Sequence, residues 1–352
     1  MSVFRQKSLA TLLEQAGQHG GLKRTLTAKS LVALGVGAII GAGLFVRTAA
    51  ASAEAAGPAV TLSFIVAAIG CLFAGLCYAE FAAMIPIAGS AYTYSYVTMG
   101  ELVAWVIGWA LVLEYALGAA TVSIAWGEYL NKLTGGAIPY QWCHSPLEVS
   151  AAGTRGIVDI PALVILLILT LLLIKGTQES ATVNAIIVVL KVTIVLVFIA
   201  VGWGFINHAN QTPYMIPAGT VGHEGLFQHG WGGILGGAGI VFFAFIGFDA
   251  VSTAAQEAKN PQRDMPIGIL GSLVICTILY IVVSTILTGL VPYHALNVPD
   301  PVAVGINVTG VWWGKLLVKI GAIFGLGTVM LVMLLGQSRV FYSMSRDGLL
   351  WK

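Results

Sequence analysis

The sequence predicts an all-α polytopic membrane protein, and three observations support this fold class. Of the 352 residues, 58% are hydrophobic and only 9% are charged, whereas a soluble domain carries roughly 25% charged residues. The mean hydropathy is +0.91. Eight long apolar segments recur along the chain, separated by short polar connections. We therefore expect the lipid bilayer to surround most of the chain.

A helix needs roughly 20 mainly apolar residues to cross a bilayer, and eight segments are long enough. In chain order they are 31–50, 59–86, 99–130, 158–176, 181–206, 233–256, 267–291 and 315–344. Between the second and third lies GSAYTYSYVTMG, which is too short to span and is predicted to be interfacial or re-entrant.

The distribution of basic residues predicts the orientation. If residues 1–29 form a cytoplasmic tail, the inner segments hold eleven Lys and Arg residues and the outer segments hold five. This asymmetry, with an even number of spans, puts both termini in the cytoplasm. The tail has no cleavable apolar core, so we expect a multi-pass protein of the cell (inner) membrane.

The composition also excludes several partners and cofactors. A net charge of +2 shows no bias toward polyanions, so no nucleic acid partner is expected. The four cysteines have no paired spacing and no histidine at metal-ligand distance, so neither a metal site nor another cofactor is predicted. No Walker A, nucleophile-elbow or HExxH motif occurs, which argues against an enzyme.

Two segments contain many glycines, GVGAIIGAGLF in the first and GGILGGAGIVFFAFIGFDAVS in the sixth. Close packing explains one such helix, since Gly37 and Gly41 form a GxxxG pair. Two of them, each opening a block, favour discontinuous helices instead. Broken helices offer free N–H groups to a carboxylate and free carbonyls to an ammonium near the midplane. We therefore expect a secondary transporter that works by alternating access.

The same reasoning divides the chain. Residues 30–206 are predicted to form a five-helix repeat and 207–232 an extracytoplasmic loop, and residues 233–352 to begin a second, inverted repeat.

Ionisable residues within the apolar segments are functional candidates because burying a charge in a bilayer is costly. Lys191 is a candidate for proton coupling, and the alternatives are a static ion pair or a cap on broken-helix carbonyls. Glu114 could bind a substrate cation, exchange a proton or bond the backbone. Asp249 is expected to cap the second half of the sixth helix. Glu80 is interpreted as a gate or a structural hydrogen bond.

Four motifs follow one another along the chain: GVGAIIGAGLFV, LEYALGAATVSIAW, FFAFIGFDAVSTAAQEAKNPQRDMPIGI and SRVFYSMSRDGLL. In this order they resemble the cationic amino acid transporter family, particularly its bacterial members, within the amino acid–polyamine–organocation superfamily. The resemblance implies the leucine-transporter-like five-plus-five inverted-repeat fold. Family members have twelve or fourteen helices, so the second repeat is expected to be incomplete here, with about eight transmembrane helices.

The resemblance also implies a substrate site at the two breaks. The substrate carboxylate is expected to meet N–H groups of the first helix, and its ammonium to meet carbonyls of both. Phe245 or Phe243 is a possible gate, and Lys191 corresponds to a lysine that replaces a sodium ion, which implies proton coupling. The residues expected at the substrate are Ile40, Gly41, Ala42, Gly43, Glu114, Phe243, Ala244, Phe245, Ile246 and Met333.

The resemblance leaves the substrate open. Glu114 matches a glutamate of the animal members, which move arginine, lysine and ornithine, whereas Met333 stands where those proteins have a smaller residue. A shorter pocket favours proton-coupled symport of small neutral L-amino acids such as alanine, with cationic amino acids as the alternative. Met330 is a second candidate for the size filter. A non-transporting amino acid sensor, or a subunit of a larger complex, is the alternative of another class, and the oligomeric state is not predicted.

Overall fold

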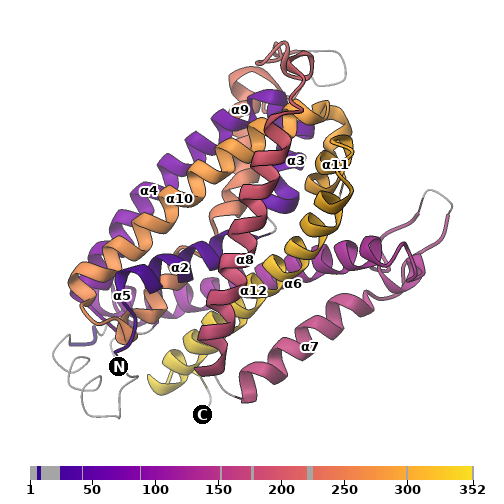
Figure 1. Ribbon diagram of the computed structural model, residues 1–352. Helices are drawn as coiled ribbons and strands as arrows, with labels where there is room; N and C mark the ends of the chain where they lie inside the picture. The colour runs from indigo at the N-terminus through magenta and orange to yellow at the C-terminus, as the bar shows by residue number, and fades with distance from the viewer. Residues whose placement is uncertain are drawn as a thin grey trace.

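The computed structural model describes residues 6–8, 24–41, 43–87, 89–150, 153–175, 178–219, 225–298 and 300–350. Within this part of the chain the elements are helical, apart from two isolated bridges. Figure 1 shows long helices running between two ends of the molecule. The all-α, polytopic fold class is therefore confirmed.

Six helical stretches in the described residues are long and apolar enough to cross a membrane. They are Gly43–Met84, Glu101–Leu133, Ile186–Trp203, Gly230–Glu257, Pro261–Leu290 and Trp312–Arg346. Two shorter apolar helices, Ala28–Ile39 and Ile160–Lys175, complete the set. All eight predicted apolar segments are thus helical.

The first predicted segment is broken. Helix α2 (Ala28–Ile39) is capped by the Thr27 side chain, which accepts from the Ser30 amide, and it ends where Ile40 turns extended, with ψ 103°. Helical structure resumes as a wide π turn at Gly43–Arg47 and continues through α3 (Thr48–Ala51) and a second wide turn, Ser52–Ala56. The predicted discontinuity in the first helix is confirmed.

The sixth segment is broken in the same manner. Helix α9 (Gly230–Phe242) ends in a tight turn, Phe243–Phe245, after which Ile246 is extended with ψ 134°. Gly247 then adopts φ +109°, a conformation that an L side chain rarely takes. A tight 3-10 helix, Asp249–Glu257, forms the second half. Gly247 is therefore the residue that permits the chain to change direction here.

The helices around the breaks pack through small residues. Helix α4 (Val60–Met84) lies along α10 (Pro261–Leu290), and a Cβ on Gly75 of α4 would lie 2.6 Å from Leu273. Helix α2 meets α10 in the same manner, because a Cβ on Gly268 would lie 2.7 Å from Leu31. Such contacts let the backbones approach closely in a membrane. Glycine thus serves close packing as well as the breaks.

Helices α6 (Glu101–Leu133) and α12 (Trp312–Arg346) cross beside this group (Figure 1). Gly118 of α6 lies under the Met333 sulfur, and Gly336 of α12 lies under the Tyr115 ring. Helix α8 (Gln178–Trp203) runs along α12 and α10 on the other side. The fold therefore surrounds both breaks with α6, α8, α10 and α12.

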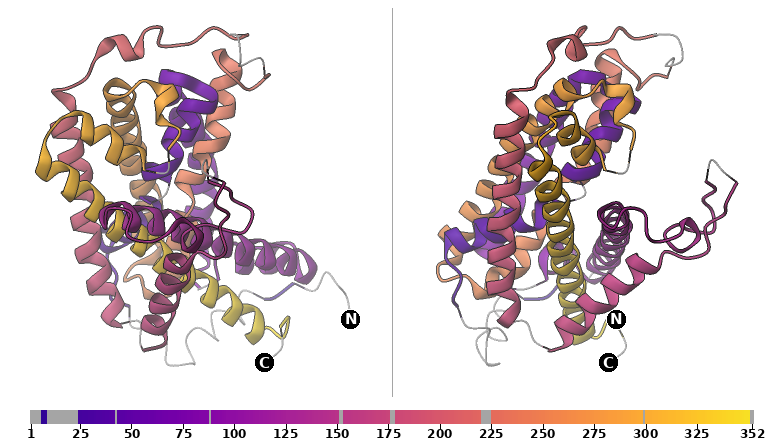
Figure 2. Two further views of the ribbon diagram at one scale, coloured as in Figure 1. Left: turned by 90° about the vertical axis from the view of Figure 1, so that its right-hand side faces the viewer. Right: turned by 45° about the vertical axis from the view of Figure 1, so that its right-hand side comes forward.

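Helix α7 (Ile160–Lys175) lies at the edge of the molecule, beside α6 and α12 (Figure 2). Most of its leucine and isoleucine side chains are exposed, as expected for a helix facing lipid. Two short helices flank the bundle, α5 (Ser90–Thr98) and α11 (Pro301–Val308). The sequence predicted a short polar segment at α5 but missed α11, whose eight residues are too few for a spanning pattern.

Two predicted boundaries need correction. Helix α10 begins at Pro261, six residues before the predicted start, because Pro261 occupies the first turn and the polar first turns extend beyond the apolar run. Helix α2 begins at Ala28, inside the predicted tail of residues 1–29, because Thr27 provides the cap. A search for apolar runs cannot detect polar helix ends of this kind.

Candidate functional site

The two breaks face each other. A Cβ added to Gly43 would collide with the backbone of Ala244, and a Cβ on Gly247 would lie 3.0 Å from the carbonyl oxygen of Ala38. Glycine at these two positions therefore lets the break of the first helix and the break of the sixth helix come into contact. Ala42, the remaining residue of the first break, lies outside the described residues.

Tyr280 of α10 joins the two breaks. Its buried hydroxyl lies 2.8 Å from the carbonyl oxygen of Ile39 and 2.8 Å from that of Ala244. One phenol proton is thus shared between carbonyls that have lost their helical partners. Because buried carbonyls without a donor are costly, Tyr280 stabilises both breaks at once. No pattern in the sequence identified this residue.

Lys191 of α8 is fully buried, and its ammonium reaches the first break. It donates to the carbonyl oxygen of Gly37, to that of Ile40 at 2.9 Å, and to the Thr328 hydroxyl of α12 at 3.1 Å. Thr328 itself donates to Gly325 at 2.8 Å, so its oxygen is free to accept from the lysine. Three acceptors therefore surround Lys191, one for each N–H of an ammonium group.

The restart of the first helix is held by side chains as well. The amides of Leu44 and Phe45 bond the carbonyl of Gly41 at 3.0 and 3.1 Å. Tyr129 of α6 donates to the carbonyl of Phe45 at 3.1 Å. The first N–H groups of a helical stretch have no acceptor within the helix. This stretch begins at Gly43. The Gly41 carbonyl and the Tyr129 hydroxyl thus hold the start of this helical stretch in place.

The aromatic residues of the second break differ in exposure. Phe245 is fully buried and packs against Phe64 and Tyr280, with ring centroids 6.4 and 5.4 Å apart. Phe243 is half-buried, and the Arg47 guanidinium lies over its ring at 5.4 Å. Of the two predicted gates, Phe243 is the one that a polar group covers, whereas Phe245 belongs to a packed aromatic cluster. Ile246 is half-buried beside them.

Glu114 and Met333 lie on facing helices. Glu114 is half-buried on α6, one turn before Gly118, and Met333 of α12 covers Gly118, since a Cβ there would lie 2.5 Å from the Met333 sulfur. Glu114 also interacts electrostatically with Asp249. A methionine and a carboxylate thus border the same part of α6, next to the second half of the broken α9 segment.

Asp249 lies at the start of the second half of the sixth helix, and Glu80 lies on α4. The capping position before Asp249–Glu257 is Phe248, without a side-chain capping bond. Asp249 is instead in the first turn, where its buried carboxylate accepts a hydrogen bond from the Tyr115 hydroxyl. Glu80 is exposed on α4. Its role as a gate or structural hydrogen bond stays a prediction.

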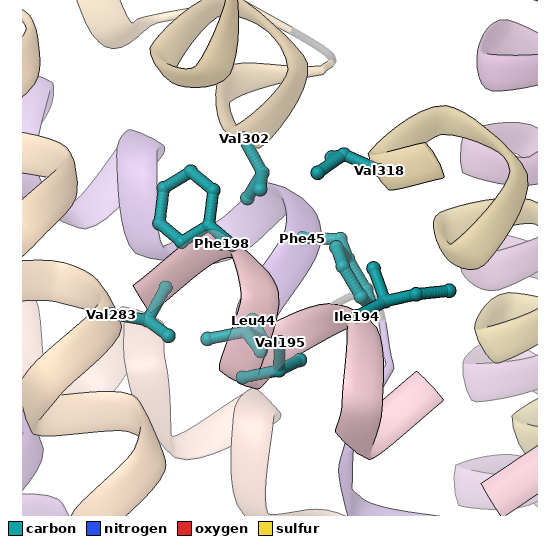
Figure 3. A pocket seen from close by; sticks show the side chains of 8 residues that line it. All are labelled: Leu44, Phe45, Ile194, Val195, Phe198, Val283, Val302 and Val318. Carbon is teal, nitrogen blue, oxygen red and sulfur yellow. The ribbon is translucent and has the colours of Figure 1, made fainter. Parts of the chain in front are cut away.

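A small apolar cavity borders the first break (Figure 3). Its volume is about 10 Å³, which is enough for about one water molecule. The cavity is lined by Leu44, Phe45, Ile194, Val195, Phe198, Val283, Val302 and Val318. It is too small for an amino acid, and its lining from α8, α10, α11 and α12 shows tight packing on this side of the break.

Known proteins are similar in sequence to this chain over almost its full length. The family model described as "Amino acid permease" matches residues 26–352. The chain is 46% identical over 354 residues to the branched-chain amino acid permease BcaP of Bacillus subtilis (strain 168), covering 99% of this chain and 72% of that protein. It is 44% identical over 352 residues to the methylthioribose transporter of the same organism, covering 99% and 73%.

Plant proteins match over the same stretch. The vacuolar cationic amino acid transporter 4 of Arabidopsis thaliana is 38% identical over 353 residues, which cover 99% of this chain and 57% of that protein. The chain therefore belongs to the amino acid permease family, within the amino acid–polyamine–organocation superfamily, and the resemblance noted from its motifs is confirmed. It is a multi-pass membrane transporter and not an enzyme.

Proposed function

We propose that this chain is a proton-coupled symporter of small neutral L-amino acids, alanine among them, in the cell membrane with its N-terminus in the cytoplasm. The observation that carries the proposal is the environment of Lys191. Its ammonium has three acceptors and, among the residues that the structure describes, no carboxylate partner; two of the acceptors are carbonyls at the end of α2. A proton bound there acts directly on the broken helix.

The substrate would lie in the gap between the half-helices. Its carboxylate would accept from amides at Gly41, Ala42 and Gly43, where a helix start favours negative charge. Its ammonium would donate to the carbonyls of Phe243 and Ile246. The carbonyls of Ile40 and Ala244 already accept from Lys191 and Tyr280, so each could offer only its second lone pair.

The proton would control the first half-helix. While Lys191 is an ammonium, its three N–H groups hold α2 to α8 and α12. A neutral amine has two N–H groups and a lone pair, which would face one of the three acceptors. Release of the proton toward the cytoplasm would therefore loosen α2 from α8 and let the first and sixth helices move. This is alternating access with the coupling group at the break.

Substrate size is the part of the proposal that rests on Met333. Its side chain fills the space above Gly118, one turn from Glu114. A long substrate side chain directed toward α6 would need that space, so a small neutral side chain fits better. The similarity to a permease whose name gives branched-chain amino acids supports a neutral substrate.

A cationic amino acid is the second candidate. Glu114 is half-buried and interacts electrostatically with Asp249, so two carboxyl groups lie near this part of α6. Such a pair would attract a substrate ammonium or guanidinium if Met333 moved aside. The similarity to a plant cationic amino acid transporter supports this reading.

Two measurements test the proposal. A thermal-shift screen of the twenty amino acids, which needs no transport cycle, should show stabilisation by alanine and other small neutral ones. Uptake of labelled alanine into liposomes should follow an inward proton gradient and ignore sodium. Sodium-dependent uptake would refute the coupling, stabilisation by arginine would favour the second candidate, and binding without uptake would favour a sensor or subunit.

A further inference from the structure

The segment before α2 pairs with the chain before α10. The Leu26 amide donates to the Glu257 carbonyl at 2.9 Å, and the Lys259 amide donates to the Leu26 carbonyl at 2.9 Å. This parallel bridge ties together two parts of the chain that are more than two hundred residues apart. It brings residues 24–29 beside residues 257–263.

The helices that follow remain side by side. A Cβ on Gly268 of α10 would meet Leu31 of α2 at 2.7 Å, and one on Gly271 would meet Val32 at 3.2 Å. The first turns of α2 and α10 therefore lie next to each other at one end of the molecule, at the lower left of Figure 1. Both helices present their N-termini at this end.

Four cationic side chains gather at these two helix starts, and we call them the basic patch: Arg24, Lys29, Lys259 and Arg263. All four are exposed, and none makes an ion pair with another residue in the described parts of the chain. The described parts of the chain thus leave the charge of the patch without an ion-pair partner.

The neighbouring acidic groups do not cancel this charge. Glu257 is paired with Arg339 at 2.7 Å. Asp264 is buried and accepts from the Asn260 amide at 3.2 Å, so it adds one negative charge at the start of α10, against the four cations of the patch. The patch therefore stays positive.

We propose that the basic patch binds the headgroup of an anionic phospholipid, such as phosphatidylglycerol. Three features of this region fit this ligand. Both helices are apolar beyond their first turns, so the patch lies where a spanning helix leaves the hydrocarbon. Clustered Lys and Arg beside a membrane helix attract anionic headgroups. Two adjacent helix N-termini add partial positive charge toward a phosphate.

The site would act on the half-helix that carries the break. Lys29 lies on α2, whereas Lys259 and Arg263 belong to the start of α10, so one headgroup touching both would hold α2 against α10. The lipid would then stabilise the arrangement in which the α2 carbonyls meet Lys191. This inference rests only on the membrane location of the chain and holds whichever ion drives transport.

The test is a lipid titration of the purified protein in neutral detergent, with phosphatidylglycerol adducts counted by native mass spectrometry. The variant pair Lys29→Gln/Arg263→Gln should weaken binding by about fivefold for each charge removed, about 25-fold in all. The control pair Arg155→Gln/Lys175→Gln removes two exposed cations outside the patch and should change binding less than about twofold. Phosphatidylcholine should bind equally to all three proteins.

The contrary outcomes are distinct. Equal loss in both pairs would mean diffuse attraction to net charge and would overturn the site, as would unchanged binding in the Lys29/Arg263 pair. Inorganic phosphate that displaces the lipid fully, at matched ionic strength, would identify a free-anion site instead of a lipid site. Thermal unfolding in the same neutral detergent checks that both variant pairs are folded, so that a loss of adducts reports binding.

Discussion

The ammonium of Lys191 lies 2.9 Å from the carbonyl oxygen of Ile40, the residue at which the first half of the broken first helix ends. A fully buried lysine thus occupies the place where the helix has lost its own amide donors. This contact makes the position of α2 depend on a group that can gain or lose a proton.

Replacing Tyr280 with phenylalanine should destabilise the protein. The change removes the hydroxyl that serves the carbonyls of Ile39 and Ala244, and leaves two buried acceptors without that donor. We expect a loss of about 1–3 kcal/mol in the free energy of unfolding. Thermal unfolding in detergent measures it. The matched control is Tyr342→Phe, since Tyr342 is 66% exposed. A similar loss of stability in Tyr342→Phe would contradict a stabilising role for the Tyr280 hydrogen bonds.

Gly43→Ala should separate the two breaks. The new methyl group would collide with the Ala244 backbone, so the variant should lose amino acid binding and about 1–3 kcal/mol of stability. Gly239→Ala is the control, because its methyl group would meet nothing within 4 Å and alanine favours a helix by up to about 1 kcal/mol. A thermal-shift assay with and without alanine measures both effects. Normal ligand binding by Gly43→Ala would contradict the proposed site.

Much of the fold was accessible from the sequence, because a bilayer makes apolar length a direct signal. The breaks were accessible for a second reason, because the first and the sixth segment both contain many glycines, among them Gly41, Gly43 and Gly247. The buried position of Lys191 followed from its apolar neighbours. These features are local, and each can be recognised without knowing which helices meet.

The remaining parts depend on tertiary contacts that a single sequence does not show. Tyr280 and Thr328 lie on α10 and α12 and acquire their roles only because those helices pass the breaks. Tyr115 was hidden for the same reason, since its partner Asp249 is 134 residues away. The exposure of Glu80 could not be predicted either, because apolar residues occur on every face of α4 and their pattern does not distinguish the lipid face from the inner face.

Met333→Ser should enlarge the accepted substrates. Removing the side chain over Gly118 opens space beside Glu114, so arginine should compete better with alanine for binding. We expect a gain of roughly 10-fold in relative affinity, about 1.4 kcal/mol. Met330→Ser is the control, because Met330 is also buried and loses a similar volume. Competition by arginine that improves equally in both variants would exclude Met333 as the size filter.

Arg47→Gln should weaken closure over the second break. The guanidinium lies 5.4 Å from the centre of the Phe243 ring, a cation–π contact that stabilises by about 0.5–1 kcal/mol at a partly exposed site. Its loss should speed release of bound amino acid by roughly two- to fivefold. Exit of preloaded labelled alanine from liposomes measures this rate. Arg47→Lys keeps a cation, so its exit rate should lie between that of the unmodified protein and that of Arg47→Gln. An unchanged exit rate in Arg47→Gln would contradict a gating role for Phe243.

The most direct test of the coupling role of Lys191 is to record proton movement together with alanine movement. With the protein in liposomes containing a pH-sensitive dye, adding alanine outside should acidify the interior, and Lys191→Ala should abolish that signal. Loss of binding in the same variant would indicate a structural role, so alanine binding is measured in parallel and should persist at reduced affinity. Alanine entry without acidification in the unmodified protein, or unchanged acidification in Lys191→Ala, would contradict the account.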